Sequence, residues 1–495
     1  MRRAIDVSMI VETEPSIDPV MPPAPPPPHK EPFGANRPRD DIMFWLRIQP
    51  SQFGETAADL FEQITVAVDP AGTHVETYYP EKFFYNGKNT WAVRDVAHLP
   101  IKTLVNEAAV VDVPDTELPL YPRDLIRGAR HLKEGDGVLL RAGLNQRWLN
   151  PGLHPEVIGN VYAGQKTGMT PEAAQWLTSK GIRLCGFDFR SPEDPTNRHE
   201  LPVHAEMHLN NVLLVEDVAN LDQLRQERVL LLTGTPLKAR HMDGGLARLV
   251  ALETESGGGY RPVDLTHVLG PYPQPRAPHR RIELVEDRLQ VMRRADFMFF
   301  EVGWGGWSDV VGPQYMRFST QAGTHLVNPF KRVDGEYQPL YAEVMSIPLS
   351  RLVAPGALFD LSYIGPRQVI SRDDIRQAQA LLEPGGWAVL RTDHSDWYRS
   401  RPDFLEDSPV LSPEAVDELA GMGAKGIVTD LTQLAPLDRR WELQAALHEH
   451  DMLAVEAAWH LWLIRKPTFT VAVLPLNIKD LQTSPAHTFI LEHWE

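Results

Sequence analysis

Ala71-Gly72-Thr73-His74 is a short sequence that the chain repeats as Ala322-Gly323-Thr324-His325, about half of its 495 residues further on. A four-residue match can arise by chance, so a duplication requires that other landmarks recur in the same order at a similar spacing. Such landmarks do recur on both sides of the repeated motif. The chain is therefore predicted to be a tandem duplication.

Two kinds of landmark support this prediction. An apolar strand ending in arginine is expected at residues 135–141 (GDGVLLR) and again at 385–391 (GGWAVLR). A helix start is expected at residues 170–173 (TPEA) and again at 412–415 (SPEA), because each has a capping hydroxyl, a proline and an acidic residue in the order that helix N-termini favour. Each predicted helix leads through a glycine into a short strand that ends in aspartate.

The copies are predicted to span residues 1–255 and 260–495, joined by a glycine-rich linker at 256–259 whose composition is typical of flexible connections. A hydrophobic content of 43% is enough for two cores of ordinary size. Alternating predicted strands and helices indicate the α/β class for each copy.

Charge and cysteine content exclude several classes of protein. A formal net charge of -17 disfavours binding to nucleic acid or to an anionic membrane surface. The single cysteine, Cys185, excludes an intramolecular disulfide and is expected in the core. No apolar run reaches the roughly 18 residues that a membrane helix needs. We expect a cytoplasmic protein with neither a nucleic acid nor a membrane as partner.

Two pairs of side chains could hold a metal ion. His74 and Glu76 are two residues apart, so on an extended strand they point to the same face. His204 is expected on a short helix, and Glu216 at the end of the strand that follows it. Two imidazoles and two carboxylates suit a divalent ion such as zinc or manganese. Taken singly, His74 could equally be a structural histidine and Glu216 a solvated strand end.

The combination resembles the cyclase superfamily, which includes kynurenine formamidase, isatin hydrolase and polyketide cyclases. Gly72-Thr73-His74-Val75-Glu76 is similar to the core of that family's first metal motif. His204 lies twelve residues before Glu216, which is the spacing of the histidine and glutamate in the family's second motif. The resemblance implies a metal site of His74, Glu76, His204 and Glu216. Glu76 replaces the family's aspartate, and Glu81 is the polar residue nearest to a missing histidine.

The second copy matches the motif less well. The corresponding positions are Gln321, His325, Val327, Gln444 and Glu456, of which only His325 and Glu456 keep a metal-binding side chain. We therefore expect a degenerate second copy. The resemblance implies two swivelling β/β/α domains that form an intramolecular pseudo-dimer, because the family's members pair into dimers whose sites the neighbouring subunit completes. A homodimer of the fused chain is also compatible with the sequence.

Three functions follow from these residues. The leading one is a metal-dependent hydrolase that attacks an amide, formamide or lactone carbonyl of a small, aromatic molecule, with Glu76 or Glu81 as the general base. The first alternative is a ring-closing cyclase or dehydratase in a secondary-metabolism pathway of the polyketide type. The second alternative is a binding protein without catalysis.

Overall fold

The computed structural model describes most of both predicted copies. The described residues are 2–6, 46–50, 62–67, 73–77, 96–114, 119–143, 168–189, 191–194, 201–236, 238, 244–254, 260–264, 300–303, 315–321, 323–334, 336–378, 380–395, 407–436, 439–478 and 481–493. The predicted linker at 256–259 and the candidate base Glu81 lie outside these residues.

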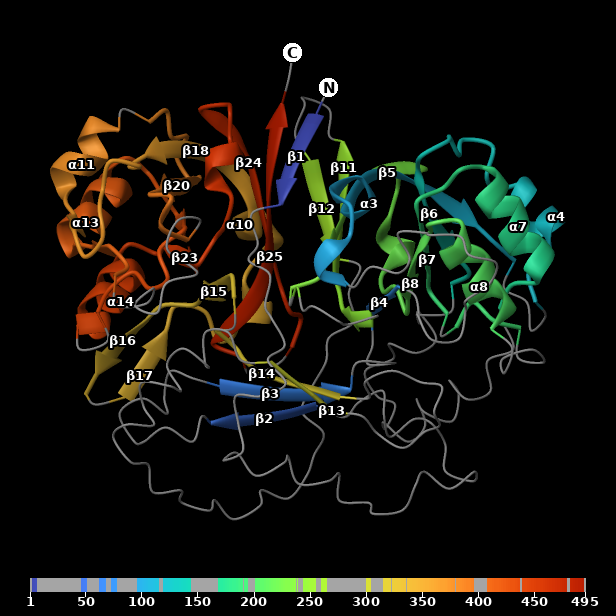
Figure 1. Ribbon diagram of the computed structural model, residues 1–495, viewed down its shortest axis with the longest axis horizontal. Helices are drawn as coiled ribbons and strands as arrows, with labels where there is room; N and C mark the ends of the chain where they lie inside the picture. Colours follow the sequence, from blue (N-terminus) through green and yellow to red (C-terminus); the bar gives the residue numbers. More distant parts are fainter. Residues whose placement is uncertain are drawn as a thin grey trace.

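Two large mixed sheets lie side by side, with helices on their outer flanks (Figure 1). The first has the order β10-β4-β8-β7-β6-β5-β9-β11-β12. Its strands are β4 (His74–Glu76), β5 (Val105–Asp112), β6 (Gly137–Arg141), β7 (Leu184–Phe187), β8 (Leu213–Glu216), β9 (Arg228–Gly234), β10 (Gly244–Leu246), β11 (Arg248–Thr254) and β12 (Tyr260–Asp264).

The second sheet has the order β1-β25-β15-β23-β22-β20-β18-β24. Because β25 also pairs with β24, seven of its strands close into a ring. Its strands are β1 (Arg2–Asp6), β15 (His325–Val327), β18 (Val353–Asp360), β20 (Trp387–Arg391), β22 (Gly426–Thr429), β23 (Leu453–Glu456), β24 (Thr468–Pro475) and β25 (Thr483–His493). The two sheets thus repeat one strand order. The run β4-β8-β7-β6-β5-β9 of the first sheet corresponds, strand by strand, to β15-β23-β22-β20-β18-β24 of the second.

The first strand of each predicted copy lies on the sheet of the other copy. β1 pairs antiparallel with β25, at the end of the chain. β12, which begins the predicted second copy, pairs antiparallel with β11 of the first sheet. Strands of both copies also form a smaller sheet, β13-β14-β3-β2, below the two large ones (Figure 1). Its strands are β2 (Leu46–Pro50), β3 (Glu62–Ala67), β13 (Phe300–Gly303) and β14 (Tyr315–Ser319).

The helices follow the same repeat. They are α3 (Ile101–Leu104), α4 (Pro122–Ile126), α7 (Pro171–Ser179) and α8 (Pro202–Leu209), followed by α10 (Leu349–Leu352), α11 (Arg372–Gln377), α13 (Pro413–Gly421) and α14 (Arg440–Glu449). The expected helix starts are present, because the Thr170 and Ser412 side chains each accept a hydrogen bond from the backbone N–H three residues on. Among the described residues, no helix is long and apolar enough to cross a membrane.

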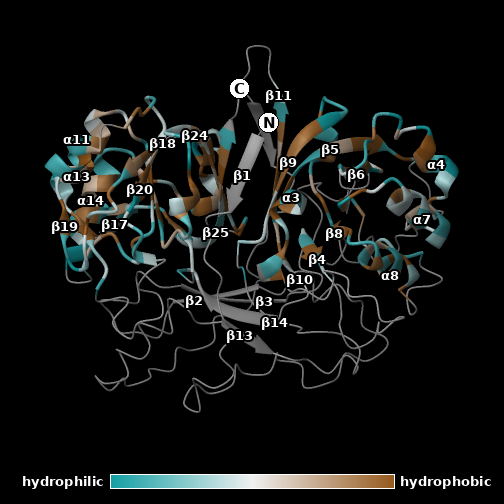
Figure 2. Ribbon diagram, turned by 45° about the horizontal axis from the view of Figure 1, so that its top comes forward, coloured by the Kyte–Doolittle hydropathy of each residue, from teal (hydrophilic) through white to brown (hydrophobic). Residues whose placement is uncertain are grey.

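Three hydrophobic clusters hold these layers together. The largest joins buried residues of both copies, such as Leu249 and Val473, so the two sheets share one central core. Each of the other clusters lies between one sheet and its own helices. Figure 2 shows hydrophobic residues concentrated along the strands and hydrophilic ones toward the outer edges. The expected core position of Cys185 is confirmed, and burial raises the pKa of its thiol.

At one pair of equivalent positions, each copy sets a large side chain opposite a glycine. Trp387 lies opposite Gly426 in the pairing of β20 with β22. At the same place in the first sheet, Gly137 lies opposite Leu184. The large and the small side chain have thus changed strands. The Trp387 ring is buried, and its Nε1 donates to the carbonyl of Arg351 at 2.8 Å.

A methyl group at Gly426 should therefore be costly, because a Cβ there would overlap the Trp387 ring. We expect Gly426→Ala to lower the free energy of unfolding by about 1–3 kcal/mol, as overpacked cores do. The matched control is Gly421→Ala at the end of α13, where an added Cβ meets nothing within 4 Å. Urea denaturation measures both, and equal stability of the two variants would contradict the packing argument.

Candidate metal centre

The pairing of β4 with β8 brings the first predicted ligands together. In this antiparallel register His74 lies directly opposite Glu216. Glu76 follows His74 on the same face of β4, as its spacing predicted. His204 lies on α8, the helix that precedes β8 and packs against it. The structure therefore gathers His74, Glu76, His204 and Glu216, all four of the predicted ligands.

The threonine of the repeated motif explains why this geometry recurs in both copies. The Thr73 hydroxyl donates to the carbonyl oxygen of Asp217 at 2.6 Å, directly after β8. In the second copy the Thr324 hydroxyl donates to the carbonyl oxygen of Ala457 at 2.7 Å. Both acceptor residues have positive φ angles, 53° and 56°. The threonine thus fixes the histidine strand to the glutamate strand, whether or not the ligands are complete.

Each of the two histidines lies within a few ångströms of both Glu76 and Glu216. His74 Nε2 is 3.3 Å from Glu76 Oε1 and 3.6 Å from Glu216 Oε2. His204 Nε2 is 2.8 Å from Glu76 Oε2 and 3.4 Å from Glu216 Oε1. His74 and Glu216 are buried, whereas the side chains of Glu76 and His204 are 18% and 12% exposed. The cluster is therefore closed around His74 and Glu216 and partly exposed at Glu76 and His204.

A fifth residue, Glu193, holds His204 in place. Its fully buried Oε1 accepts hydrogen bonds from the His204 ring Nδ1 at 2.7 Å and from the His204 backbone N–H at 2.8 Å. Oε2 accepts from the backbone N–H of Val203 at 3.2 Å, which caps the start of α8. The Nδ1 contact directs Nε2 toward Glu76 and Glu216. A carboxylate behind a histidine ligand is a common support of metal sites.

Burial and crowding shift the pKa values of the cluster in opposite directions. Burial alone would raise the pKa of Glu76, but the charge of His204 and hydrogen bonds from both histidines hold it well below its usual value. Burial alone would lower the pKa of His204, but the surrounding glutamates raise it well above its usual value. Burial and the charge of Glu76 raise the pKa of Glu216. Carboxylates outnumber imidazoles here, so a bound cation would relieve their repulsion.

Two further residues beside the cluster escaped the sequence analysis. His208 lies one helical turn after His204, with the ring centroids 5.9 Å apart. Burial, and to a smaller extent the charge of the nearby His204, lowers the pKa of His208 to about 3. Asp217 is 1% exposed, and within the described part of the chain its carboxylate oxygens have no hydrogen-bond partner. The sequence could have indicated His208 through its spacing, because it lies four residues after His204 and therefore on the same face of the helix.

The second copy keeps the register but not the ligands. His325 lies opposite Glu456, and its Nε2 is 3.2 Å from Glu456 Oε2. Val327 and Gln444 stand where the first copy has Glu76 and His204. Across the described ranges, the only set of three or more metal-binding side chains whose ligand atoms lie within 4.8 Å of one another is His74, Glu76 and Glu216.

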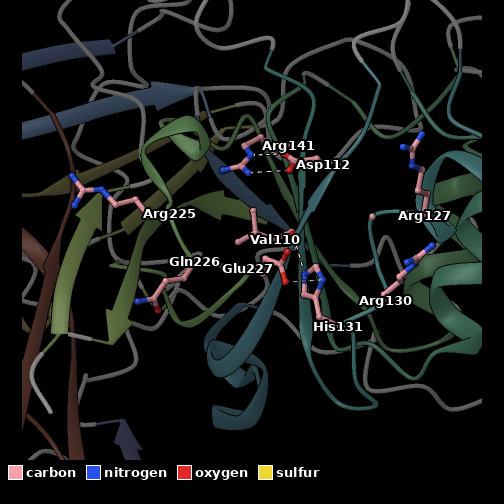
Figure 3. Close-up of a pocket in the computed structure, with 10 residues that line it drawn as sticks. Val110, Asp112, Arg127, Arg130, His131, Arg141, Arg225, Gln226 and Glu227 are labelled. Carbon is pink, nitrogen blue, oxygen red and sulfur yellow. Dashed lines mark hydrogen bonds and ion pairs between the residues drawn. The ribbon is translucent and has the colours of Figure 1, made fainter. Parts of the chain in front are cut away.

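A separate cavity of about 410 Å³ opens near the ends of β5 and β6. Its wall includes Arg141, which binds Asp112 through two nitrogens at 2.6 and 3.1 Å, while Arg225 points away from Arg127 and Arg130 (Figure 3). None of the predicted metal ligands lines it. The cavity therefore does not bear on the metal centre.

A model of the Cyclase family matches residues 5–194 and 263–436, more than half of the chain. The chain belongs to the Cyclase family. The two matched stretches fall one in each predicted copy of this Cyclase chain, as a tandem duplication requires. No curated protein matches it.

Solved structures of several hydrolases are similar to parts of this Cyclase chain. An isatin hydrolase bound to the product analogue thioisatinate aligns with 39% of this chain and 82% of its own, at 18% identity and a TM-score of 0.35. Isatin hydrolase A from Labrenzia aggregata gives the same coverages, with 20% identity and a TM-score of 0.34. A protein described as a predicted metal-dependent hydrolase from Bacillus stearothermophilus aligns with 39% and 86%, at 19% identity and a TM-score of 0.32. Likenesses this distant do not identify a reaction.

Removing the Glu193 carboxylate should weaken both α8 and the position of His204. We expect Glu193→Ala to lower the free energy of unfolding of metal-free protein by about 1–3 kcal/mol, because it leaves buried N–H groups without an acceptor. Glu193→Gln keeps an acceptor oxygen and should cost less. Denaturation in the presence of a chelator measures the difference, and an equal loss in both variants would refute the role of the acceptor.

Proposed function

We propose that this Cyclase chain is a metal-dependent hydrolase with one active site, in its first copy. The observation that carries the proposal is the convergence of His74, Glu76, His204 and Glu216, with His204 held from behind by Glu193. Two nitrogen and two carboxylate donors suit zinc or manganese. The excess of buried carboxylates also favours a cation, so the residues present fit such an ion.

The residues around the centre have separate roles in the proposed reaction. A divalent ion supplies the chemistry of water activation and carbonyl polarisation. His74 and Glu216 form the buried wall and exclude bulk water. Glu76 lies on the open side beside His204, where its carboxylate can accept a proton from the attacking water. Glu81 stays a second candidate for this base. The substrate class remains an amide, formamide or lactone of a small aromatic molecule.

We further propose that the second copy acts as the built-in partner of a pseudo-dimer. The exchange of β1 and β12 and the shared central core support this arrangement. Buried polar contacts add to it: the Thr235 backbone N–H donates to His487 Nδ1 at 2.8 Å, and Arg248 donates to Asn477 Oδ1 at 3.1 Å.

Metal content separates this proposal from a binding protein without catalysis. We expect one ion per chain in protein produced with added zinc and manganese, lost in His74→Ala but kept in His325→Ala, since the second copy lacks two of the four ligands. Elemental analysis of the purified variants gives the count. A wild type without metal would remove the basis of the hydrolase, and equal loss in both variants would contradict a single site.

Substrate trials separate hydrolysis from ring closure. We expect hydrolysis of at least one of N-formylkynurenine, isatin or simple aryl lactones, with kcat/KM lowered more than about a hundredfold in His74→Ala, because even groups behind metal ligands contribute 10–100-fold. His325→Ala should retain the activity. If wild-type protein contains metal and hydrolyses none of these compounds, ring closure of a pathway-specific precursor becomes the better proposal.

A further inference from the structure

The second copy contains a buried polar cluster at the place that corresponds to the metal centre. His325 and Glu456 are 1% and 2% exposed, and they face each other across β15 and β23. Gln444 on α14 is also buried there. Because two of the four ligand positions are occupied by Val327 and an amide, this donor set does not fit a divalent ion. A buried carboxylate still needs a compensating charge.

Arg440 provides that charge. The residue is 5% exposed, and its Nη2 lies 3.6 Å from Glu456 Oε2, the oxygen that also faces His325. Both terminal nitrogens lie 3.4 Å from Gln321 Oε1. The other carboxylate oxygen, Oε1, accepts the Leu434 backbone N–H at 3.1 Å. Each oxygen of Glu456 therefore faces a donor that belongs to the chain itself.

The length of α14 explains how the arginine reaches this place. Gln444 stands where the first copy has His204, and α14 begins at Arg440, four residues earlier. Residues four apart share one face of a helix, so Arg440 and Gln444 point to the same side. In the first copy α8 begins only at Pro202, two residues before His204. At the start of α8, the backbone N–H groups of Val203 and His204 instead donate to Glu193, a group of opposite charge to Arg440.

Burial by itself would raise the pKa of Glu456, but the charge of Arg440 and the hydrogen bond from His325 hold it below the usual value. This direction agrees with the geometry. Glu216, the counterpart of Glu456, has a raised pKa because of its burial and the charge of Glu76. The two copies thus surround an equivalent glutamate with opposite charge.

We propose that Arg440 is the permanent cation of the second copy, whose guanidinium occupies the place of a metal ion and closes this site to one. The second copy is then held together by an internal ion pair and needs no metal. This inference goes beyond the proposed function, because it holds whatever reaction the first copy performs.

A double-mutant cycle tests the ion pair, with all variants kept in a chelator so that the first copy contributes no metal. Arg440→Met should lower the midpoint of thermal unfolding by roughly 5–10 °C, because it leaves a buried carboxylate unpaired. In a Glu456→Gln background the same substitution should lower it by less than half as much. Equal shifts in the two backgrounds would show that Arg440 is not the counter-charge of Glu456 and would overturn the proposal.

Two variants control for unspecific effects. Arg439→Met removes the neighbouring arginine, which is exposed and paired with Glu442 at 2.6 Å, and should shift the midpoint by at most about 2 °C. Arg440→Lys keeps the positive charge and should retain more stability than Arg440→Met. If Arg440→Lys is as damaging as Arg440→Met, charge is not what the site requires, and the proposal fails.

Metal titration tests the closure of the site. In His74→Ala protein, in which the first centre is broken, calorimetry with Zn²⁺ should detect no ion bound at the second copy. An ion that binds to this variant and is lost on adding His325→Ala would overturn the proposal. Failure of the proposed hydrolase has a different signature, since wild-type protein would then bind no ion, while the double-mutant cycle would still report on Arg440.

Discussion

The antiparallel pairing of one short histidine strand with one glutamate strand is the constraint on which the rest of each copy depends. β4 against β8 and β15 against β23 have the same register, which places His74 opposite Glu216 and His325 opposite Glu456. A slip of the histidine strand by one residue would move the histidine to the face opposite its glutamate. The register survives in the copy without a full ligand set. The register is therefore held by packing and by the hydroxyl groups of Thr73 and Thr324, rather than by a metal.

The two copies meet the same electrostatic problem in different ways. A buried glutamate beside a buried histidine is costly unless a positive charge compensates it. The first copy adds the carboxylates Glu76 and Glu193, whose repulsion the proposed cation would relieve. The second copy removes carboxylates and carries Arg440. In the proposed arrangement the first copy keeps a centre that can exchange its cation and the second copy has a fixed ion pair, so that chemistry and support would be divided between the halves.

The sequence was sufficient for the features that depend on local pattern. Duplication, helix starts at Thr170 and Ser412 and the family could be predicted from repeated landmarks, and the structure brings the four predicted ligands together, although their roles remain predictions. Contacts that depend on tertiary packing could not be predicted. Glu193 contacts His204 from a position 11 residues earlier in the chain, and Arg440 reaches Glu456 because α14 is longer than α8. The exchange of β1 and β12 could not be predicted either, because the sequence pattern of a strand does not indicate which of the two sheets it joins.

That exchange also sets an order in time for a chain made from its N-terminus. The first sheet can take up its last strand, β12, as soon as Asp264 is available. β1 is made long before its partner β25, with Arg2 opposite His493. At the usual speed of a ribosome, β1 waits on the order of a minute for that partner. β1 can thus be placed only after β25 has been made, and their pairing then joins two strands that are far apart in the sequence.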